Sequence, residues 1–296
     1  MAHIPVIVID PAQAIGHGEI GPFPFEQCTL AMLAQGDSWF SIGAFPPTLT
    51  TNLLAELTLG RSAVIVNCAR PGHVLQHMAS TTSDRQFLSL LSGPLSRRWN
   101  AVLVSGGGND LIDAVGVPPS APARLRLLAT PAERGNAPDG AAAYLSAPGW
   151  VTFSDHLAQV FDLLLAARRR GPNQRTPMFL HTYAALTPRP AGAGLGFGPW
   201  LQPWLQAYEV PVDQWQPIAA LLIDRLAELL GRLVEQEMQA DPNAALALVD
   251  TRSAGLALSA LGATGESGDF VNEIHPTRGG YAKLGGPWRV ALDALA

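Results

Sequence analysis

The chain contains five short apolar runs that are separated by longer stretches. The runs cover residues 29–35, 62–68, 100–105, 176–182 and 245–250. Each run is largely continuous in apolar residues rather than alternating, which is typical of strands that are covered on both faces. Helical patterns lie between the runs, the clearest from Asp155 to Arg170 and from Asp213 to Gln239. This alternation predicts an α/β fold with a parallel sheet and helices on both of its faces.

The composition limits the class of protein and its partners. Of the 296 residues, 48% are hydrophobic and 15% are charged, and the formal net charge is −5. These values are typical of a compact enzyme with a sizeable core. The negative balance argues against nucleic acid or an anionic membrane as the main partner, because both require a basic surface. The two cysteines, Cys28 and Cys68, are too few for a disulfide framework, and we expect them to be small buried side chains.

The chain shows no sign of membrane insertion or export. No apolar stretch reaches the length of a membrane span. Residues 1–10 contain no Lys or Arg and no obvious cleavage site, so they do not resemble a signal peptide. We therefore expect a cytoplasmic location by default and a single domain over residues 1–296. Residues 1–28 form an N-terminal extension whose order the sequence leaves open.

Two segments interrupt the regular alternation. Residues 115–150 are rich in Pro, Ala and Gly, and residues 186–215 contain a glycine cluster and a run of aromatic side chains. Loops of this length inside a compact domain are usually functional or disordered. Because each follows a strand, both are expected at the carboxyl edge of the sheet as a cap or lid over a substrate pocket. The alternative for the aromatic side chains of 186–215, equally open, is that they cover a second small core.

A serine follows the first apolar run in a tight turn, Gly36-Asp37-Ser38. We expect Gly36 to adopt a backbone conformation that other residues resist, which would present Ser38 at the carboxyl edge of the sheet. Open α/β sheets bind their ligands at that edge. A serine alone is a poor nucleophile and requires a base within hydrogen-bond reach.

Three further blocks lie at strand ends or near the C-terminus, and one of them supplies a base. Gly72 follows the second run, Gly107-x-Asn109-Asp110 follows the third, and His275-Pro276 precedes a last amphipathic segment. Together with Gly36-Asp37-Ser38, these blocks resemble the SGNH hydrolases, also called GDSL esterases and lipases. Each block alone is a weak signal, but four in the right order over residues 29–295 are fairly specific.

The resemblance implies a fold and a role for each matched residue. It implies a three-layer α/β/α, flavodoxin-like parallel sheet with loop insertions that form a cap. Ser38 would be the nucleophile, and His275 the general base that activates it. The backbone N–H groups of Ser38 and Gly72 and the side-chain amide of Asn109 would form the oxyanion hole.

One position departs from the family pattern. The family usually carries Asp three residues before the histidine, and this chain has Asn272 there. An asparagine can orient the imidazole but supplies no charge. Either Asn272 or Asp269 is expected to contact His275, and the sequence does not decide between them. Glu273 is expected to point toward solvent, because neighbours in sequence rarely face the same partner.

Four further side chains are candidates for substrate contact. Trp39 follows the serine, His181 and Tyr183 end the fourth run, and Trp200 belongs to the aromatic segment. The sequence leaves open whether His181 contacts the substrate or has a structural role. His73 and His77 lie four residues apart, but the sequence offers no third ligand and no metalloprotease glutamate between them, so we expect no metal site.

These observations favour a serine ester hydrolase that acts on small or lipid-like acyl esters through an acyl-serine intermediate. The resemblance implies neither a metal nor an organic cofactor. Acyl transfer to another acceptor, or removal of acetyl groups from a carbohydrate, would use the same residues. A non-catalytic binding protein on a degenerate scaffold is the alternative from another class, and Asn272 is the feature that favours it. The oligomeric state is left open.

Overall fold

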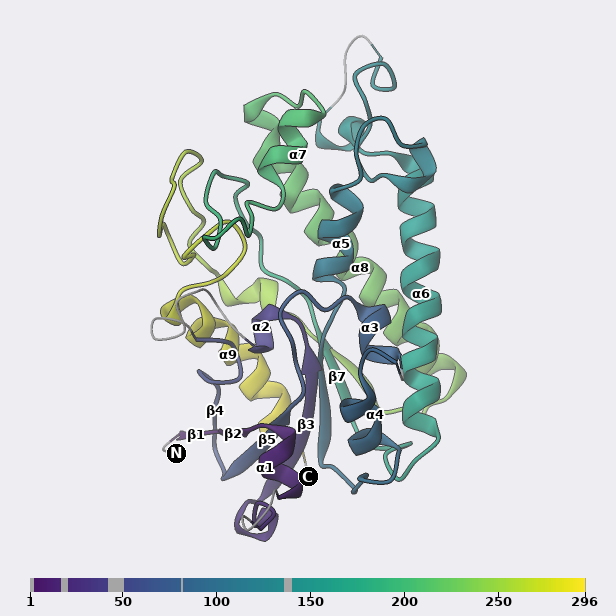
Figure 1. The fold of residues 1–296 in the computed structure, drawn as a ribbon, viewed down its shortest axis with the longest axis vertical. Coiled ribbons are helices and arrows are strands. Elements are labelled where there is room, and N and C mark those ends of the chain that lie inside the picture. The colour runs from purple at the N-terminus through teal and green to yellow at the C-terminus, as the bar shows by residue number, and fades with distance from the viewer. Residues whose placement is uncertain (1–2, 17–20, 42–50, 81, 136–139, 296) are drawn as a thin grey trace.

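A six-stranded parallel sheet forms the centre of the computed structural model, which describes residues 3–16, 21–41, 51–80, 82–135 and 140–295. The strand order is β2-β5-β3-β6-β7-β8, and every neighbouring pair is parallel. Figure 1 shows this sheet between layers of helices. The strands are β2 (Ile7–Ile9), β3 (Leu30–Gly36), β5 (Ala63–Asn67), β6 (Ala101–Ser105), β7 (Met178–His181) and β8 (Leu246–Val249).

The five strands predicted from the sequence are all present. Within this sheet, the five strands that follow β2 in the chain lie in the flavodoxin-like order. The second of them, β5, is outside the first, β3, and the others follow on the opposite side. All seven residues of the central strand β3 are buried, as expected for a strand covered on both faces. The predicted fold class is therefore confirmed by the sheet itself.

Helices cover both faces of the sheet (Figure 1). Helix α6 packs against α3, α4 and α8, and α9 lies on the other side of the sheet. None of the helices in the described residues is both long and apolar enough to cross a membrane. The helices are α1 (Pro11–Ile15), α2 (Ser38–Ser41), α3 (Leu75–Ala79), α4 (Arg85–Leu91), α5 (Gly108–Val115), α6 (Ala147–Arg169), α7 (Gln202–Ala207), α8 (Val212–Ala240) and α9 (Arg278–Asp293).

The two long predicted helices are present, but α6 begins eight residues earlier than predicted. Helix α8 extends one residue beyond the prediction at each end. Helix α6 begins at Ala147 instead of Asp155, because the Ser146 side chain caps it by accepting the N–H of Gly149 at 3.2 Å. Pro148 lies in its first turn, where the missing N–H costs nothing. A proline and a glycine that resemble a loop therefore belong to the helix.

Part of the N-terminal extension adds an edge to the sheet. Strand β2 pairs in parallel with β5, and β1 (Ile4–Pro5) pairs antiparallel with β4 (Thr58–Leu59). Helix α1 is capped by the side chain of Asp10, which accepts the N–H of Gln13 at 2.8 Å. Within residues 1–28, residues 1–2 and 17–20 lie outside the described part. These three-residue and two-residue strands are too short to give a clear apolar pattern.

The two insertions lie beyond the carboxyl edge of the sheet (Figure 1). In 115–150, a 3₁₀ turn at Ala123–Leu125 packs on α6, and Arg126 donates two hydrogen bonds of 2.6 Å to Glu133. Residues 136–139 of this segment lie outside the described part.

The segment 186–215 runs irregularly to α7 and supplies part of a second small core. That core is formed by Leu186, Leu201, Ala219, Phe270 and Ile274. Four of these side chains, all except Phe270, also line the pocket described below. The segment contributes the aliphatic Leu186 and Leu201, and of its aromatic side chains only Trp200 packs against this core.

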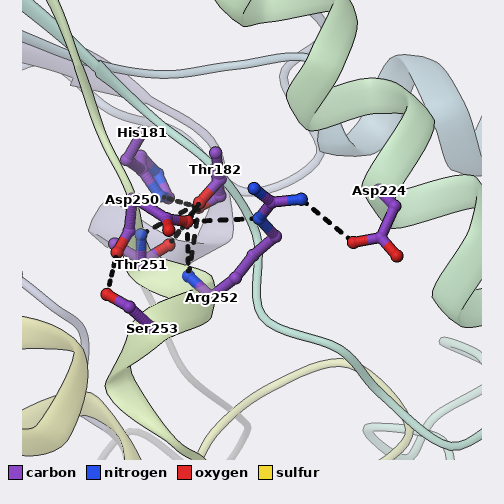
Figure 2. A network of polar contacts seen from close by, with 7 residues as sticks. All are labelled: His181, Thr182, Asp224, Asp250, Thr251, Arg252 and Ser253. Carbon is purple, nitrogen blue, oxygen red and sulfur yellow. Dashed lines mark hydrogen bonds and ion pairs between the residues drawn. The ribbon is translucent and has the colours of Figure 1, made fainter.

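A polar network joins the carboxyl ends of β7 and β8, and Figure 2 shows it from close by. The Thr182 hydroxyl accepts the N–H of Thr251 at 2.9 Å and donates to Asp250 at 3.1 Å. Arg252 extends the network to α8 through an ion pair of 3.0 Å with Asp224. These bonds fix the carboxyl ends of β7 and β8, from which loops of the site extend.

Candidate active site

Ser38 is the first residue of the short helix α2, directly beyond the central strand β3. Gly36 is required here for space and not for an unusual backbone conformation, which corrects the sequence-based expectation. Its φ lies outside the left-handed region, but a Cβ at Gly36 would lie 2.6 Å from Cβ of Ser105 on β6. Glycine thus lets β3 and β6 approach closely just below the serine. The Asp37 carboxylate braces the turn by accepting the N–H of Trp39 at 3.0 Å.

Three residues from two distant parts of the chain form a line of hydrogen bonds. Nε2 of His275 lies 2.8 Å from Oγ of Ser38. On the other side of the ring, Nδ1 of His275 lies 3.1 Å from Oδ1 of Asn272. All three side chains are buried, with exposed fractions of 8% or less. The arrangement is that of a nucleophile, a base and a group that orients the base.

The orientation of the Asn272 amide is fixed by its surroundings. Its Oδ1 also accepts the main-chain N–H of Ile274 at 3.2 Å and that of His275 at 2.9 Å. An amide NH₂ group in that place would face two N–H donors, so the oxygen must occupy it. Since this oxygen can only accept, Nδ1 of His275 carries the ring proton. Nε2 is therefore free to accept the proton of Ser38.

Asp269 does not contact His275, so of the two residues left open by the sequence the structure brings Asn272 to the ring. The Asp269 carboxylate accepts the N–H of Ala257 and the ammonium group of Lys283, both at 2.6 Å. It therefore belongs to the packing between the 255–268 loop and α9.

Glu273 is buried, contrary to the expectation that it faces solvent. Its side chain is 1% exposed, and its two carboxylate oxygens accept four backbone N–H groups. The donors are Arg189, Trp200, Leu201 and Gln202. Glu273 thus joins the loop that carries Asn272 and His275 to the 186–202 segment.

The proposed oxyanion donors lie beyond three adjacent strands, β5, β3 and β6. Gly72 adopts a left-handed conformation with φ +75°, which glycine permits without strain. The Asn109 amide donates one hydrogen bond of 3.1 Å to the carbonyl of His73, next to Gly72. Its second N–H remains available, and both Asn109 and Ser38 line one pocket.

This pocket is apolar apart from the residues at its Ser38 end. Trp39 and Tyr183, two of the predicted substrate contacts, belong to its lining. Hydrophobic side chains from α5, α8, the 186–202 segment and the loop that carries His275 complete the wall, among them Leu111, Leu186, Leu201, Leu222, Ile223 and Ile274. The cavity is small, about 30 Å³, which is room for about two water molecules. Of the described residues in 115–150, only Val115 lines it.

Trp200 contacts the candidate base rather than the pocket wall. Its ring packs edge-on against the imidazole of His275, with centroids 5.2 Å apart. Burial lowers the pKa of His275 to about 4. The imidazole is therefore neutral, and able to act as a base, over the whole range above mildly acidic pH.

His181 lies beneath the site and does not reach the pocket, which corrects its assignment as a substrate contact. Its side chain is fully buried and stacks against Trp39 and Phe40. Nδ1 lies 2.6 Å from the carbonyl of Thr182, and Nε2 lies 2.8 Å from Oγ of Ser105. Figure 2 shows His181 beside Thr182. Both ring nitrogens have partners within the protein, so the histidine is structural.

Ser105 connects His181 to Asp37 and was not recognised from the sequence. Its Oγ lies 2.8 Å from Oδ1 of Asp37, while the Tyr183 hydroxyl lies 2.5 Å from Oδ2. Burial raises the pKa of Asp37 to about 6. The sequence signal that could have pointed to Ser105 is its place at the end of a buried strand, next to the turn that carries Ser38.

His73 and His77 lie with ring centroids 5.6 Å apart. Across the described ranges, no group of three or more His, Cys, Asp or Glu side chains has the spacing of a metal site.

No protein-family model and no curated protein matches the sequence. Solved structures do match. A carbohydrate acetylesterase from Sinorhizobium meliloti is 13% identical with a TM-score of 0.48, over 90% of this chain and 100% of that chain. An extracellular lipase from Streptomyces rimosus is 13% identical with a TM-score of 0.47, over the same shares. A structure named as a GDSL-like lipase, from Parabacteroides merdae, is 11% identical with a TM-score of 0.42, over 90% and 96%. At these identities the likeness concerns the fold alone.

Proposed function

We propose that the protein is a serine ester hydrolase of the SGNH type that acts through an acyl-serine intermediate. One observation carries the proposal: the line of hydrogen bonds from Ser38 through His275 to Asn272, with distances of 2.8 and 3.1 Å. It ends at an apolar pocket that Ser38 shares with the amide of Asn109. Ser38 thus has a base with a fixed tautomer within hydrogen-bond reach and faces the same pocket as a hydrogen-bond donor.

In the first half of the reaction, Oγ of Ser38 attacks the carbonyl carbon of the ester while Nε2 of His275 takes the hydroxyl proton. The carbonyl oxygen becomes an oxyanion, which the N–H groups of Ser38 and Gly72 and the amide of Asn109 stabilise by hydrogen bonds. When the tetrahedral intermediate collapses, the bond to the alkoxy group breaks. His275 returns its proton to that leaving oxygen, and the acyl group remains on Ser38.

In the second half, a water molecule takes the place of the alcohol. His275 removes its proton as the water oxygen attacks the acyl carbon, and the same donors hold the new oxyanion. Collapse breaks the bond to Oγ, and His275 returns the proton to Ser38. The carboxylic acid leaves, and the site is restored.

The pocket favours an apolar acyl group next to the ester carbonyl. Its wall is formed almost entirely by hydrophobic side chains, and its cavity of about 30 Å³ holds only a short group. Among soluble esters we therefore propose a preference for short acyl chains.

The test is hydrolysis of p-nitrophenyl esters from acetate to a long chain by the wild type and by Ser38→Ala. Removal of a nucleophile of this kind costs about 10⁴-fold or more in turnover. Ser41→Ala, three residues further along α2, is the matched control and should retain activity because, among the described residues, its hydroxyl donates to the carbonyl of Asp37 at 2.8 Å and to no other group. Equal rates for the wild type and Ser38→Ala throughout the series would overturn the proposal and favour a binding protein or a different acyl acceptor.

A further inference from the structure

The 186–202 segment carries a tight turn that holds two large apolar side chains in solvent. Leu195 is 83% exposed and Phe197 is 68% exposed. The turn closes through hydrogen bonds from Ala193 to Phe197 at 2.7 Å and from Phe197 to Gly194 at 3.0 Å. Leu195 has φ 51°, a conformation that is uncommon for a large side chain. The local backbone thus displays these side chains instead of burying them.

A second loop adds two more exposed apolar side chains beside the turn. Leu258 is 38% exposed and Leu261 is 36% exposed. Arg189 holds the two loops together, because its guanidinium donates to the carbonyl of Ala263 at 3.0 Å and also to that of Gly265. Figure 1 shows the two loops side by side beyond α2. We call Leu195, Phe197, Leu258 and Leu261 the apolar rim.

The two stretches of chain that carry the rim contain no charged residue. The sequence from Pro190 to Tyr208 contains no Asp, Glu, Lys, Arg or His, and the same holds from Gly255 to Gly265. Exposed apolar clusters of this kind mark contact surfaces. Without Lys or Arg, and with a net charge of −5 for the chain, the rim offers nothing to an anionic lipid headgroup.

The shape of the rim favours a fluid apolar surface over a second copy of the chain. A stable dimer buries about 800 Å² on each partner, and four partly exposed side chains on two loops offer well under that area. Side chains on protruding loops enter a lipid surface easily, because the lipid deforms around them.

The turn that carries Leu195 and Phe197 lies between two residues of the pocket wall in the sequence. Leu186 and Leu201 flank the turn in sequence, and both line the pocket beside Ser38. The base of the turn is also tied to the histidine loop, since Glu273 accepts the N–H of Leu201 at 2.9 Å. The cavity of about 30 Å³ holds only the first carbons of an acyl chain, so the rest of a longer chain must lie outside it.

We propose that the apolar rim seats the protein on the surface of a zwitterionic lipid aggregate, from which it takes a lipid ester as substrate. The second clause rests on the proposed ester hydrolysis, whereas the first does not. A lipid at the rim keeps its distal chain in the aggregate while its ester carbonyl reaches Ser38.

Binding is tested with Ser38→Ala protein, which cannot consume the lipid, and phosphatidylcholine vesicles in a flotation assay. The rim variant combines Leu195→Ser and Phe197→Ser in this background. The matched control combines Leu163→Ser on α6 and Val290→Ser on α9, which are 57% and 73% exposed. We expect the rim variant to reduce the vesicle-bound fraction about tenfold or more and the control to leave it unchanged. Equal binding by all three proteins, or no binding by any, would overturn the proposal.

Measurements of hydrolysis distinguish a failure of the lipid-surface proposal from a failure of the proposed ester hydrolysis. The rim substitutions are made in the catalytically intact chain, and hydrolysis is compared for soluble p-nitrophenyl acetate and for an ester embedded in phosphatidylcholine vesicles. We expect the acetate rate to be unchanged and the vesicle rate to fall about tenfold or more. Equal vesicle rates would refute the role of the rim while leaving the esterase intact. If sedimentation equilibrium shows a dimer that the rim substitutions abolish, while vesicle binding is unchanged, the rim contacts a second copy of the chain. That result would refute the lipid surface.

Discussion

Asn272 holds His275 through a single oxygen, which accepts both the main-chain N–H of the histidine at 2.9 Å and its ring Nδ1 at 3.1 Å. Replacing a triad aspartate by asparagine costs about 10⁴ in turnover where the amide enforces the wrong ring tautomer. That cost does not arise here, because the main-chain donors keep the NH₂ group away from the ring. What Asn272 lacks is the negative charge that stabilises an imidazolium.

Asn272→Asp should supply this charge without moving the ring. Because a carboxylate favours the charged imidazole, the pKa of His275 should rise from about 4 by about one to three units. The acid limb of kcat/KM, which in the wild type falls as the pH drops through about 4, should move upward by the same amount. At pH 8 kcat should increase about tenfold, since a charge-assisted hydrogen bond is stronger than a neutral one by about 1–2 kcal/mol.

A pH–rate profile of both proteins from pH 3 to 9 checks this prediction. Asn272→Ala is the control, because it removes the orienting oxygen and should lower kcat at every pH. Superimposable acid limbs for the wild type and Asn272→Asp would show that residue 272 does not act on the base.

Asn109 should contribute to turnover as a hydrogen-bond donor to the oxyanion. Asn109→Ala should lower kcat by about 10²–10³ with little change in KM, since the bond strengthens only as charge develops. Asn109→Asp keeps the size but places a carboxylate at the oxyanion, so its kcat should be lower still. Steady-state kinetics on a short p-nitrophenyl ester measures both. A higher kcat for Asp than for Ala would indicate a packing role for this side chain.

The sheet could be predicted from the sequence because its pattern is carried by local apolar runs. Strand β3, from Leu30 to Gly36, is buried at every position, so its apolar character records its environment directly. Strand β2 was not predicted, because a strand of three residues at the edge of the sheet is too short to show an apolar run. The start of α6 was misplaced since the capping bond of Ser146 depends on geometry that residue types do not reveal.

The candidate site was predictable only as far as it follows from short blocks at strand ends. Ser38, Asn109 and His275 belong to such blocks, and topology brings strand ends to one edge. The partners of Glu273 lie in a segment more than 70 residues away in sequence, so no local pattern could show that this carboxylate is buried. Ser105 is similar, because its partners His181 and Asp37 come from other strands.

A proton is required on the Asp37, Ser105 and His181 network. Nδ1 of His181 donates to the carbonyl of Thr182, so Nε2 of the neutral ring accepts from Ser105. The Ser105 hydroxyl also contacts Oδ1 of Asp37 at 2.8 Å, and its single proton cannot serve both neighbours, so a further proton on Asp37 or on His181 is needed to complete both bonds. Burial raises the pKa of Asp37 to about 6 and lowers that of His181 to about 4, so at mildly acidic pH the proton lies on Asp37.

Asp37→Asn should therefore change how stability depends on pH. A folded-state pKa near 6, above the ordinary value of 3.8, means that the folded wild type holds the proton over this range and loses stability as the pH rises through it. The variant lacks this loss. Its free energy of unfolding relative to the wild type should increase from pH 4 to 6 by an amount on the order of 3 kcal/mol and stay constant above.

Urea unfolding at several pH values measures this difference. The difference is informative even if the substitution costs stability at all pH values, because only its pH dependence reports the titration of Asp37. A difference that does not vary between pH 4 and 8 would mean that Asp37 titrates alike in the folded and unfolded chain.

Glu273→Gln should destabilise the protein, because the carboxylate of Glu273 accepts four backbone N–H groups in a buried place. One of the two oxygens becomes an NH₂ group that faces two N–H donors, which leaves both without an acceptor. Each of the two orphaned donors costs about 1–3 kcal/mol, so the free energy of unfolding should fall by about 2–6 kcal/mol. Glu266→Gln, on the exposed part of the neighbouring loop, is the matched control and should change it by less than about 0.5 kcal/mol. Urea unfolding of both variants at pH 8 tests the assignment, and equal stabilities would show that the loop of His275 is held by other contacts.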